Sequence, residues 1–313
     1  MAKNIQLFGG DYEHAQGMSG TYQGVNIEYV VRPLLEIFEG MLEKRSYPAC
    51  EFSLANYIML KDRGAEWLSA IPIFPYRAFR HSTLFVREDS SMRHPSELKG
   101  KHVGVPDYSM TAAVWTRGIL NQQYGVHPSE MRWTAGGKQR FAALKGVDLT
   151  ISHDDLEDLL IAGKIDALLT PHTHDELRPK EERKLRPLIA NPQQAEEEYL
   201  ALTGFYPINH VVVIRDDSLK AIDGVGTAIF EAYAKAKAAA YKRRLGTTLL
   251  PWGQRYWTSM FDRFGGDPMP YGLTELNRKI VSTVGQFLYE QKLISTLPDV
   301  EVLFLPETRG LPT

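Results

Sequence analysis

The segment from Lys101 to Gly125 places a strand, a polar loop and a helix in direct succession, and this order constrains the fold more than any other feature of the chain. Lys101–Pro106 is apolar and β-branched enough to predict a strand. A helix is predicted next, with a polar opening from Asp107 to Thr111 and an end at Gly125. Loops between a parallel strand and the next helix are where α/β proteins hold ligands. The segment therefore predicts an α/β fold with a candidate ligand site at this loop.

The same order of elements recurs along the chain. Asp154–Ala162 predicts a helix, and Gly163–Thr170 predicts a turn into a strand that ends beside His172 and His174. Other elements are predicted from apolar spacing, caps and helix breakers. The strands are predicted at Ile5–Phe8, Glu51–Leu54 and Ser82–Val86, and the helices begin after Pro33 and after Ser53 or lie at Gly226–Arg244 and from about Thr274 to Gln291. Three of the helices have a predicted core-facing side: Leu34, Phe38 and Leu42 after Pro33; Ala112, Trp115 and Ile119 after Asp107; and Ile229, Tyr233, Ala236 and Ala240 within Gly226–Arg244.

Length and charge narrow the class of protein. The 313 residues suit two lobes of ordinary size, and a net charge of -2 favours neither nucleic acid nor an anionic membrane as a partner. The single cysteine, Cys50, permits no internal disulfide and is expected to be a packed side chain. No apolar run of about 18 residues is present to span a bilayer, and the N-terminal residues do not read as a signal peptide. We expect a cytoplasmic protein, with a homo-oligomer possible.

Two arginines and a histidine precede one of the predicted strands. Arg77, Arg80 and His81 lie in the stretch Ile71–Val86. A guanidinium group is flat and permanently charged, and it binds a carboxylate through two parallel hydrogen bonds. Two such groups three residues apart, followed by a side chain that titrates near neutral pH, suit a small dianion. The alternative interpretation is a pair of arginines on a surface loop.

Other polar residues lie where predicted strands end or begin. Tyr12 follows the first strand in the loop Gly9–Tyr12, and Ser53 could cap a helix that holds Asn56 in its first turn. His210 begins an apolar strand, as His81 does. Each has a plain structural alternative as a turn, cap or packing residue. His172 and His174 could both bind a metal, but no spacing supplies a third ligand, so no metal site is predicted.

Several of these segments resemble one family along nearly the whole chain. Two predicted crossings between lobes, near residues 80–87 and 208–215, resemble the type II periplasmic-binding-protein architecture, with a mixed sheet and flanking helices in each lobe and a ligand cleft between the lobes. The implied lobes are residues 1–82 with 215–313, and residues 83–214. More narrowly, the chain resembles the 4,5-dihydroxyphthalate decarboxylase family. The matching segments are Phe52–Leu60, Phe74–Ser82, Gly104–Leu120, Pro207–His210 and Gly266–Gly272, with Asn277-Arg278 and Glu290-Gln291.

One departure from the family pattern lies near the N-terminus. Members tend to carry an arginine shortly after the Asp-Tyr pair, whereas this chain continues from Asp11-Tyr12 to Glu13-His14. If that arginine touches the substrate in relatives, the ring substituent recognised here differs.

The resemblance implies an enzyme that removes carbon dioxide from a hydroxylated aromatic dicarboxylate without oxidation. For 4,5-dihydroxyphthalate the product is 3,4-dihydroxybenzoate, and no cofactor is expected because the ring itself accepts the electrons. A base takes a phenolic proton while an acid protonates the carboxylate-bearing carbon. The residues expected to act are His81, His210 and Asp107 in proton transfer, and Arg77, Arg80, Ser53, Asn56, Thr111, Tyr12 and His172 in substrate binding.

Two other functions remain open from the sequence. One is a cytoplasmic solute-binding or sensor protein that captures an aromatic acid without catalysis. The other is a precursor-synthesis enzyme of the pyrimidine type on the same architecture, which would need a different histidine-rich region. Which histidine is the acid and which is the base is not assigned by the residues alone.

Overall fold

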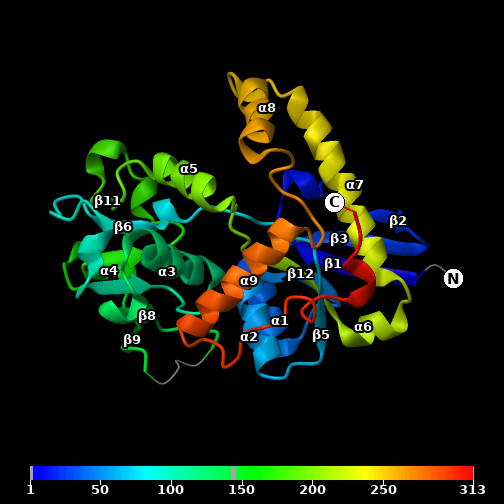
Figure 1. The fold of residues 1–313 in the computed structure, drawn as a ribbon, viewed down its shortest axis with the longest axis horizontal. Coiled ribbons are helices and arrows are strands. Elements are labelled where there is room, and N and C mark those ends of the chain that lie inside the picture. Colours follow the sequence, from blue (N-terminus) through cyan, green and yellow to red (C-terminus); the bar gives the residue numbers. More distant parts are fainter. Residues whose placement is uncertain (1–2, 142–145, 313) are drawn as a thin grey trace. The chain divides into compact units, whose positions relative to one another are not determined.

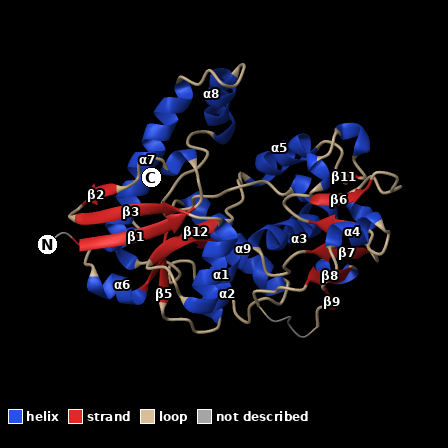
Figure 2. Cartoon of the chain, turned by 180° about the vertical axis from the view of Figure 1, so that it is seen from behind, coloured by secondary structure: helices blue, strands red, loops and turns tan. Residues whose placement is uncertain are grey.

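Two six-stranded mixed sheets, each flanked by helices, organise the chain in the computed structural model (Figure 1, Figure 2). The structure describes residues 3–141 and 146–312. The chain divides into unit 1, formed by Met1–Arg77, Ile208–Ser282 and Pro298–Thr313, and unit 2, formed by Ala78–Pro207 and Thr283–Leu297. The predicted α/β class with a mixed sheet and helices in each part is confirmed.

The division differs from the predicted lobes, 1–82 with 215–313 and 83–214, in two ways. The chain leaves unit 1 after Arg77 and returns to it at Ile208, whereas the predicted lobes change after residue 82 and at residue 215. Residues 283–297 also belong to unit 2 rather than to unit 1. The last difference has a packing cause. Phe287 packs edge-on against Trp115 with ring centroids 5.5 Å apart, and the Gln291 amide donates to the Val114 carbonyl at 2.9 Å.

The sheet of unit 1 has the strand order β2-β3-β1-β4-β12-β5. Its strands are β1 (Lys3–Gly9), β2 (Gly20–Tyr22), β3 (Val25–Val31), β4 (Ala49–Ser53), β5 (Leu68–Ile71) and β12 (His210–Arg215). β1 is parallel to β3 and β4, whereas β12 runs antiparallel to β4 and β5. Consequently β12 begins at the edge of the sheet where β1 and β4 end.

Helices α1 (Leu34–Lys44), α2 (Leu54–Asp62), α6 (Asp216–Ala221), α7 (Val225–Leu245) and α8 (Gly253–Phe264) belong to unit 1. The predicted buried face of α7 is confirmed, because all four of its predicted residues are buried. In α1 the prediction is wrong in part: Ile37, Phe38 and Met41 are buried, while Leu34 and Leu42 are only half-buried. Positions four apart drift around a helix of 3.6 residues per turn, so the three-residue set follows the core more closely.

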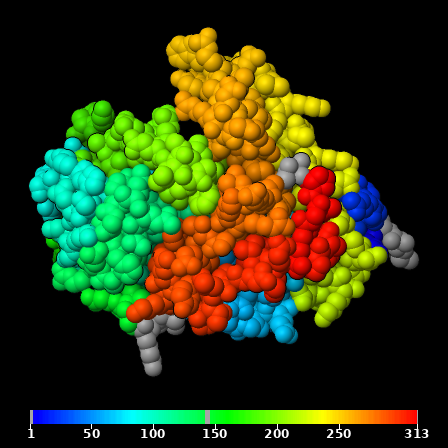
Figure 3. All heavy atoms as spheres, viewed as in Figure 1, coloured from blue at the N-terminus to red at the C-terminus, as the bar shows by residue number. Residues whose placement is uncertain are grey.

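Helix α8 packs on α7 through aromatic rings, and exposed apolar residues lie just before its first turn. Tyr241 of α7 contacts the rings of Trp257 and Phe261 edge-on. Leu249 and Trp252, just before α8, are 96% and 70% exposed, and the orange and yellow surface of this segment is open to view in Figure 3. Among the described residues, no helix is both long enough and apolar enough to cross a membrane.

The sheet of unit 2 has the strand order β11-β6-β10-β7-β8-β9. Its strands are β6 (Leu84–Arg87), β7 (His102–Val105), β8 (Arg132–Gly136), β9 (Leu149–Ser152), β10 (Ala167–Leu169) and β11 (Leu185–Pro187). β7, β8, β9 and β10 are parallel, and β6 runs antiparallel to both of its neighbours, β10 and β11. The predicted strand at 82–86 begins later, because His81–Thr83 forms a 3-10 turn in which the Thr83 hydroxyl donates to the Arg80 carbonyl at 2.7 Å.

Helices α3 (Thr111–Tyr124), α4 (Leu156–Ile161) and α5 (Pro192–Thr203) belong to unit 2, and α9 (Glu275–Glu290) begins in unit 1 and ends in unit 2. The predicted end of α3 at Gly125 and the predicted cap of α2 by Ser53 are confirmed. The first ten residues of α3 are all buried, including the predicted core residue Trp115. Cys50 is also buried, as expected.

Replacing Gly118 of α3 with alanine is expected to destabilise the protein by about 1–2 kcal/mol. An alanine in a helix interior normally gains about 1 kcal/mol over glycine. Here an added Cβ would overlap the ring of Phe287, which is itself packed on Trp115. Urea unfolding measures the change. Gly310→Ala, where an added Cβ meets open space, is the matched control, and a stabilised Gly118→Ala variant would contradict the packing argument.

Candidate active site

Polar residues of unit 1 gather at the edge of the sheet where the parallel strands end. β1 leads into Gly10 and Tyr12, and β4 ends at Ser53. The antiparallel pairing of β12 with β4 places His210 opposite Ser53. Local sequence could not predict this register, because Ser53 and His210 are far apart in the chain. The structure thus brings together three residues that were predicted separately: Tyr12, Ser53 and His210.

Glu51 links two of these residues, and the sequence analysis did not single it out. Its side chain is fully buried in the central strand β4. Its carboxylate accepts hydrogen bonds from the Gly10 amide at 3.0 Å, from the Tyr12 hydroxyl at 2.8 Å and from Nδ1 of His210 at 2.5 Å. The sequence holds one weak signal for Glu51, which is an acidic residue inside the apolar strand Ala49–Ser53. A charged side chain is almost never fully buried unless it is paired, so a buried acid in such a strand indicates a partner.

Aromatic rings stack on the two side chains, Tyr12 and His210, that donate to this carboxylate. Tyr76 stacks on His210 at 4.9 Å and on Tyr12 at 6.2 Å between ring centroids, and His14 stacks on Tyr12 at 5.0 Å. Burial and the nearby Glu51 charge raise the pKa of Tyr12 far above its ordinary value, so its hydroxyl stays protonated and donates to Glu51. Burial lowers the pKa of His14, which favours a neutral imidazole.

Arg77 lies inside unit 1 and is 4% exposed. Its Nη2 donates to the Pro270 carbonyl at 2.8 Å and to the Asn277 side-chain oxygen at 2.7 Å. Asn277 in turn donates to the Pro270 and Gly272 carbonyls. Both acceptors are neutral, so these two hydrogen bonds hold the guanidinium group in place but do not neutralise its charge. Its role in binding a carboxylate stays a prediction.

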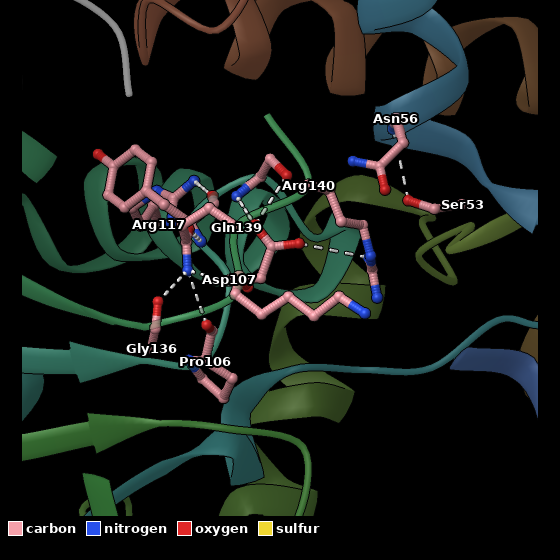
Figure 4. A network of polar contacts seen from close by, with 11 residues as sticks. Ser53, Asn56, Pro106, Asp107, Arg117, Gly136, Gln139 and Arg140 are labelled. Atoms are coloured by element: carbon pink, nitrogen blue, oxygen red, sulfur yellow. Dashed lines mark hydrogen bonds and ion pairs between the residues drawn. The ribbon is translucent and has the colours of Figure 1, made fainter. Parts of the chain in front are cut away.

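Ser53 and Asn56 lie at the start of α2. The Ser53 hydroxyl accepts a hydrogen bond from the main-chain N–H of Asn56 at 3.4 Å, and Figure 4 draws this helix cap. Both side chains are buried. The first amides of a helix carry partial positive charge and are suited to an anion. The local arrangement is therefore compatible with the predicted contact to a carboxylate, which stays a prediction.

The polar turn after β7 is the corresponding feature of unit 2. Asp107 accepts from the Ser109 amide at 2.9 Å and from its hydroxyl at 2.8 Å, and its second oxygen lies 3.5 Å from Nη1 of Arg140. Figure 4 shows Gln139 joining the ends of β7 and β8 by donating to the Pro106 and Gly136 carbonyls. Asp107 thus lies in the turn after β7, and Thr111 is the first residue of α3, so both lie at the helix opening that the strand–loop–helix order predicted.

Arg117 supports this turn from within the unit. It is completely buried, its Nη2 donates to the Tyr108 carbonyl at 2.7 Å, and its Nε donates to the Gln291 side chain at 2.8 Å. The guanidinium carbon lies 3.7 Å from the centre of the Tyr108 ring. Among the described residues, Nη1 of Arg117 has no hydrogen-bond partner. Burial lowers the pKa of this guanidinium.

Arg80 and His81 are both buried in unit 2, with exposed fractions of 5% and 2%. The Nε2 atom of His81 lies 2.9 Å from the side-chain oxygen of Gln123, and its ring contacts that of Tyr199 at 5.4 Å. Burial lowers the pKa of His81. Burial raises the pKa of Glu196 to about 7 although the Arg80 charge opposes the rise. The roles of Arg80 and His81 stay predictions.

His172 and His174 follow β10 and are both exposed. Among residues 3–141 and 146–312, no group of three histidine, cysteine or acidic side chains is arranged to hold a metal ion. The His172 carbonyl accepts from the Thr170 hydroxyl at 2.9 Å, which fixes the backbone here. The predicted contact of His172 with substrate, like the predicted ligand cleft, stays a prediction.

Comparison with known proteins gives two similar relatives of the same kind. This chain is 29% identical over 269 residues to a 4,5-dihydroxyphthalate decarboxylase of Comamonas testosteroni, covering 80% of each chain. It is 31% identical over 181 residues to a 4,5-dihydroxyphthalate decarboxylase of Pseudomonas putida, covering 54% of this chain and 70% of the relative. No model of a protein family matches the chain.

Solved structures with the same fold are far more distant in sequence. The periplasmic aliphatic sulphonate binding protein of Escherichia coli matches with a TM-score of 0.60 and 13% identity over 100% of this chain and 94% of its own. The ligand-binding component of an ABC-type import system from Staphylococcus aureus matches with a TM-score of 0.54 and 11% identity over 97% and 96% of the two chains. At this identity the likeness shows the fold alone.

Proposed function

Because the chain belongs to the 4,5-dihydroxyphthalate decarboxylase family, we propose that it removes carbon dioxide from 4,5-dihydroxyphthalate, without oxidation, to form 3,4-dihydroxybenzoate. The observation that carries the proposal is the similarity to a decarboxylase of that name across 80% of both chains. The paired His210 and Glu51 side chains add support, since the reaction needs a positioned proton-transfer group.

The chemistry requires proton transfer at two points of the substrate. A base takes the proton of the hydroxyl para to the departing carboxylate, and the electron pair of that O–H bond moves into the ring. The ring carbon that bears the carboxylate then takes a proton from an acid. When carbon dioxide leaves, the C–C bonding pair returns to the ring and restores aromaticity. The product phenolate is finally reprotonated, so the net reaction consumes one proton and needs no oxidant.

The chain offers groups for each of these tasks. His210, His81 and Asp107 are proposed to transfer protons, and each is positioned by a hydrogen-bond partner: Glu51, Gln123 and Ser109. The dicarboxylate is proposed to be bound by cationic side chains and neutral donors, because paired guanidinium groups suit carboxylates. These binding residues are Arg77, Arg80, Ser53, Asn56, Thr111, Tyr12 and His172.

We also propose that the reaction needs no cofactor and takes place in the cytoplasm. The ring acts as the electron acceptor, so the chemistry itself requires no additional electron sink. A small aromatic acid is the proposed partner, and neither nucleic acid nor a membrane is proposed, because the net charge of -2 gives no general attraction to polyanions.

Direct assay tests the function. The purified protein is mixed with 4,5-dihydroxyphthalate, with and without a chelator, while the ultraviolet spectrum and carbon dioxide release are followed. We expect 3,4-dihydroxybenzoate to form at the same rate in both samples. Loss of turnover after chelation would contradict the cofactor-free chemistry. Binding of the dicarboxylate without any release of carbon dioxide would contradict the enzyme and support a binding or sensor protein.

A further inference from the structure

We propose that Glu51 is the positioning residue that makes His210 the general base for the phenolic hydroxyl. The inference rests on the proposed function, and it assigns a role that the sequence left open between two histidines. The inference follows from the buried Glu51 carboxylate, which accepts hydrogen bonds from the Gly10 main-chain amide, the Tyr12 hydroxyl and the His210 imidazole.

The hydrogen bond from His210 sets which ring nitrogen carries the proton. A buried carboxylate accepts hydrogen bonds, so Nδ1 of His210 is the donor across the 2.5 Å contact. In the neutral ring Nε2 is then the nitrogen with a free lone pair. A base must present that lone pair to the substrate, and the bond to Glu51 holds the ring in the tautomer that does so.

The same contact favours the product of proton transfer. When Nε2 takes the phenolic proton, the His210 ring becomes positive beside a carboxylate that is fully buried. Attraction between opposite charges is stronger in such an environment than in water. Stacking of Tyr76 on one face and the edge contact of Phe38 keep the ring in place. Glu51 thus acts on the reaction through His210 rather than by touching the substrate.

His81 lacks these features. Its hydrogen-bond partner among the described residues is the neutral side chain of Gln123, and burial lowers its pKa. Protonating His81 would create a positive charge in a buried place with no carboxylate bonded to it. The contrast between the two histidines assigns the base to His210.

Glu51→Gln tests the assignment with little change in size. Oε1 of Glu51 accepts from Tyr12 and His210, and Oε2 accepts from Gly10. A glutamine side chain has one oxygen that accepts and one NH₂ group that only donates. It therefore cannot accept from Gly10 on one side and from Tyr12 and His210 on the other. With its oxygen toward Gly10, its amide would face Nδ1 of His210 and favour the tautomer that has no lone pair on Nε2.

We expect Glu51→Gln to lower kcat about 100-fold, within the range for loss of general acid-base catalysis, with KM changed less than about threefold. Glu51→Asp keeps the charge and is expected to recover at least about tenfold of the lost kcat. Glu28→Gln makes the same substitution at an exposed residue of β3 and is the matched control. Equal kcat values for the wild type and Glu51→Gln would overturn the proposal.

A measurement on the free protein separates this inference from the proposed function. Selective ¹⁵N labelling of histidine, with His210→Gln to assign the signal, reports which ring nitrogen of His210 is protonated. We expect the proton on Nδ1 in the wild type, even if the protein turns over no dicarboxylate at all. A proton on Nε2 would overturn the role of Glu51, whatever the activity and even if Glu51→Gln failed to fold.

Discussion

His210→Ala is expected to lower kcat about 10²–10⁴-fold while KM changes little, because general acid-base catalysis contributes a factor of that size. The side chain lies at the start of β12, where Glu51 holds it through Nδ1. Its removal takes away the proposed proton acceptor and leaves the side chains proposed to bind the carboxylates in place. Initial rates over a range of 4,5-dihydroxyphthalate concentrations separate the two constants.

Three further variants are compared with His210→Ala. His81→Ala is also expected to lower turnover more than affinity, but by a smaller factor than His210→Ala, because His81 has a neutral partner. Arg80→Ala is expected to act mainly on KM, since it removes a charge proposed to bind a carboxylate. His153→Ala, at an exposed position, controls for removal of a histidine. Full turnover in both His210→Ala and His81→Ala would refute the proposed proton-transfer roles.

Arg117→Ala is expected to lower the free energy of unfolding by about 3–5 kcal/mol. The substitution leaves a void in the core of unit 2 and deprives the Tyr108 carbonyl and the Gln291 side chain of their donor. Removing the charge offsets part of this loss, because burial already lowers the pKa of the guanidinium and so disfavours its charged form. The losses of packing and of two hydrogen bonds outweigh that gain.

Urea unfolding and hydrogen exchange of the α3 amides measure the effect. Arg117→Met fills most of the space without a charge, so it is expected to lose less stability than Arg117→Ala. Arg132→Ala removes an exposed arginine on the neighbouring strand β8 and is expected to change stability by less than about 0.5 kcal/mol. An Arg117→Ala variant as stable as this control would show that the buried guanidinium does not support the turn.

Local sequence predicted those elements whose signals lie within a few residues. The strand, polar turn and helix from Lys101 to Gly125 were recognised because β-branched runs, a polar helix start and a C-terminal glycine act on neighbouring residues. The Ser53 cap and the buried face of α7 were found in the same way. The strand before Arg87 was placed too early because the 3-10 turn at His81 depends on contacts that the apolar pattern does not encode.

The candidate site was only partly accessible to this kind of prediction. Tyr12 and His210 were chosen for their chemistry, but nothing near either one indicated that they share a partner. The sequence alone does not single out Glu51, because an acidic residue in a short strand is more often exposed than buried. Its burial depends on β1 and β12 lying on either side of β4, and that order joins three distant segments.

The sequence by itself determined the α/β class, the positions of most helices and strands, and the polar residues at the ends of strands, because each depends on short-range periodicity, capping and turn preference. Only the tertiary structure decided that residues 283–297 belong with α3, and that His210 lies against a buried carboxylate while His81 lies against an amide. The physical reason is that a side chain's protonation and partners depend on burial and on strand register, and both arise from contacts between residues far apart in the chain.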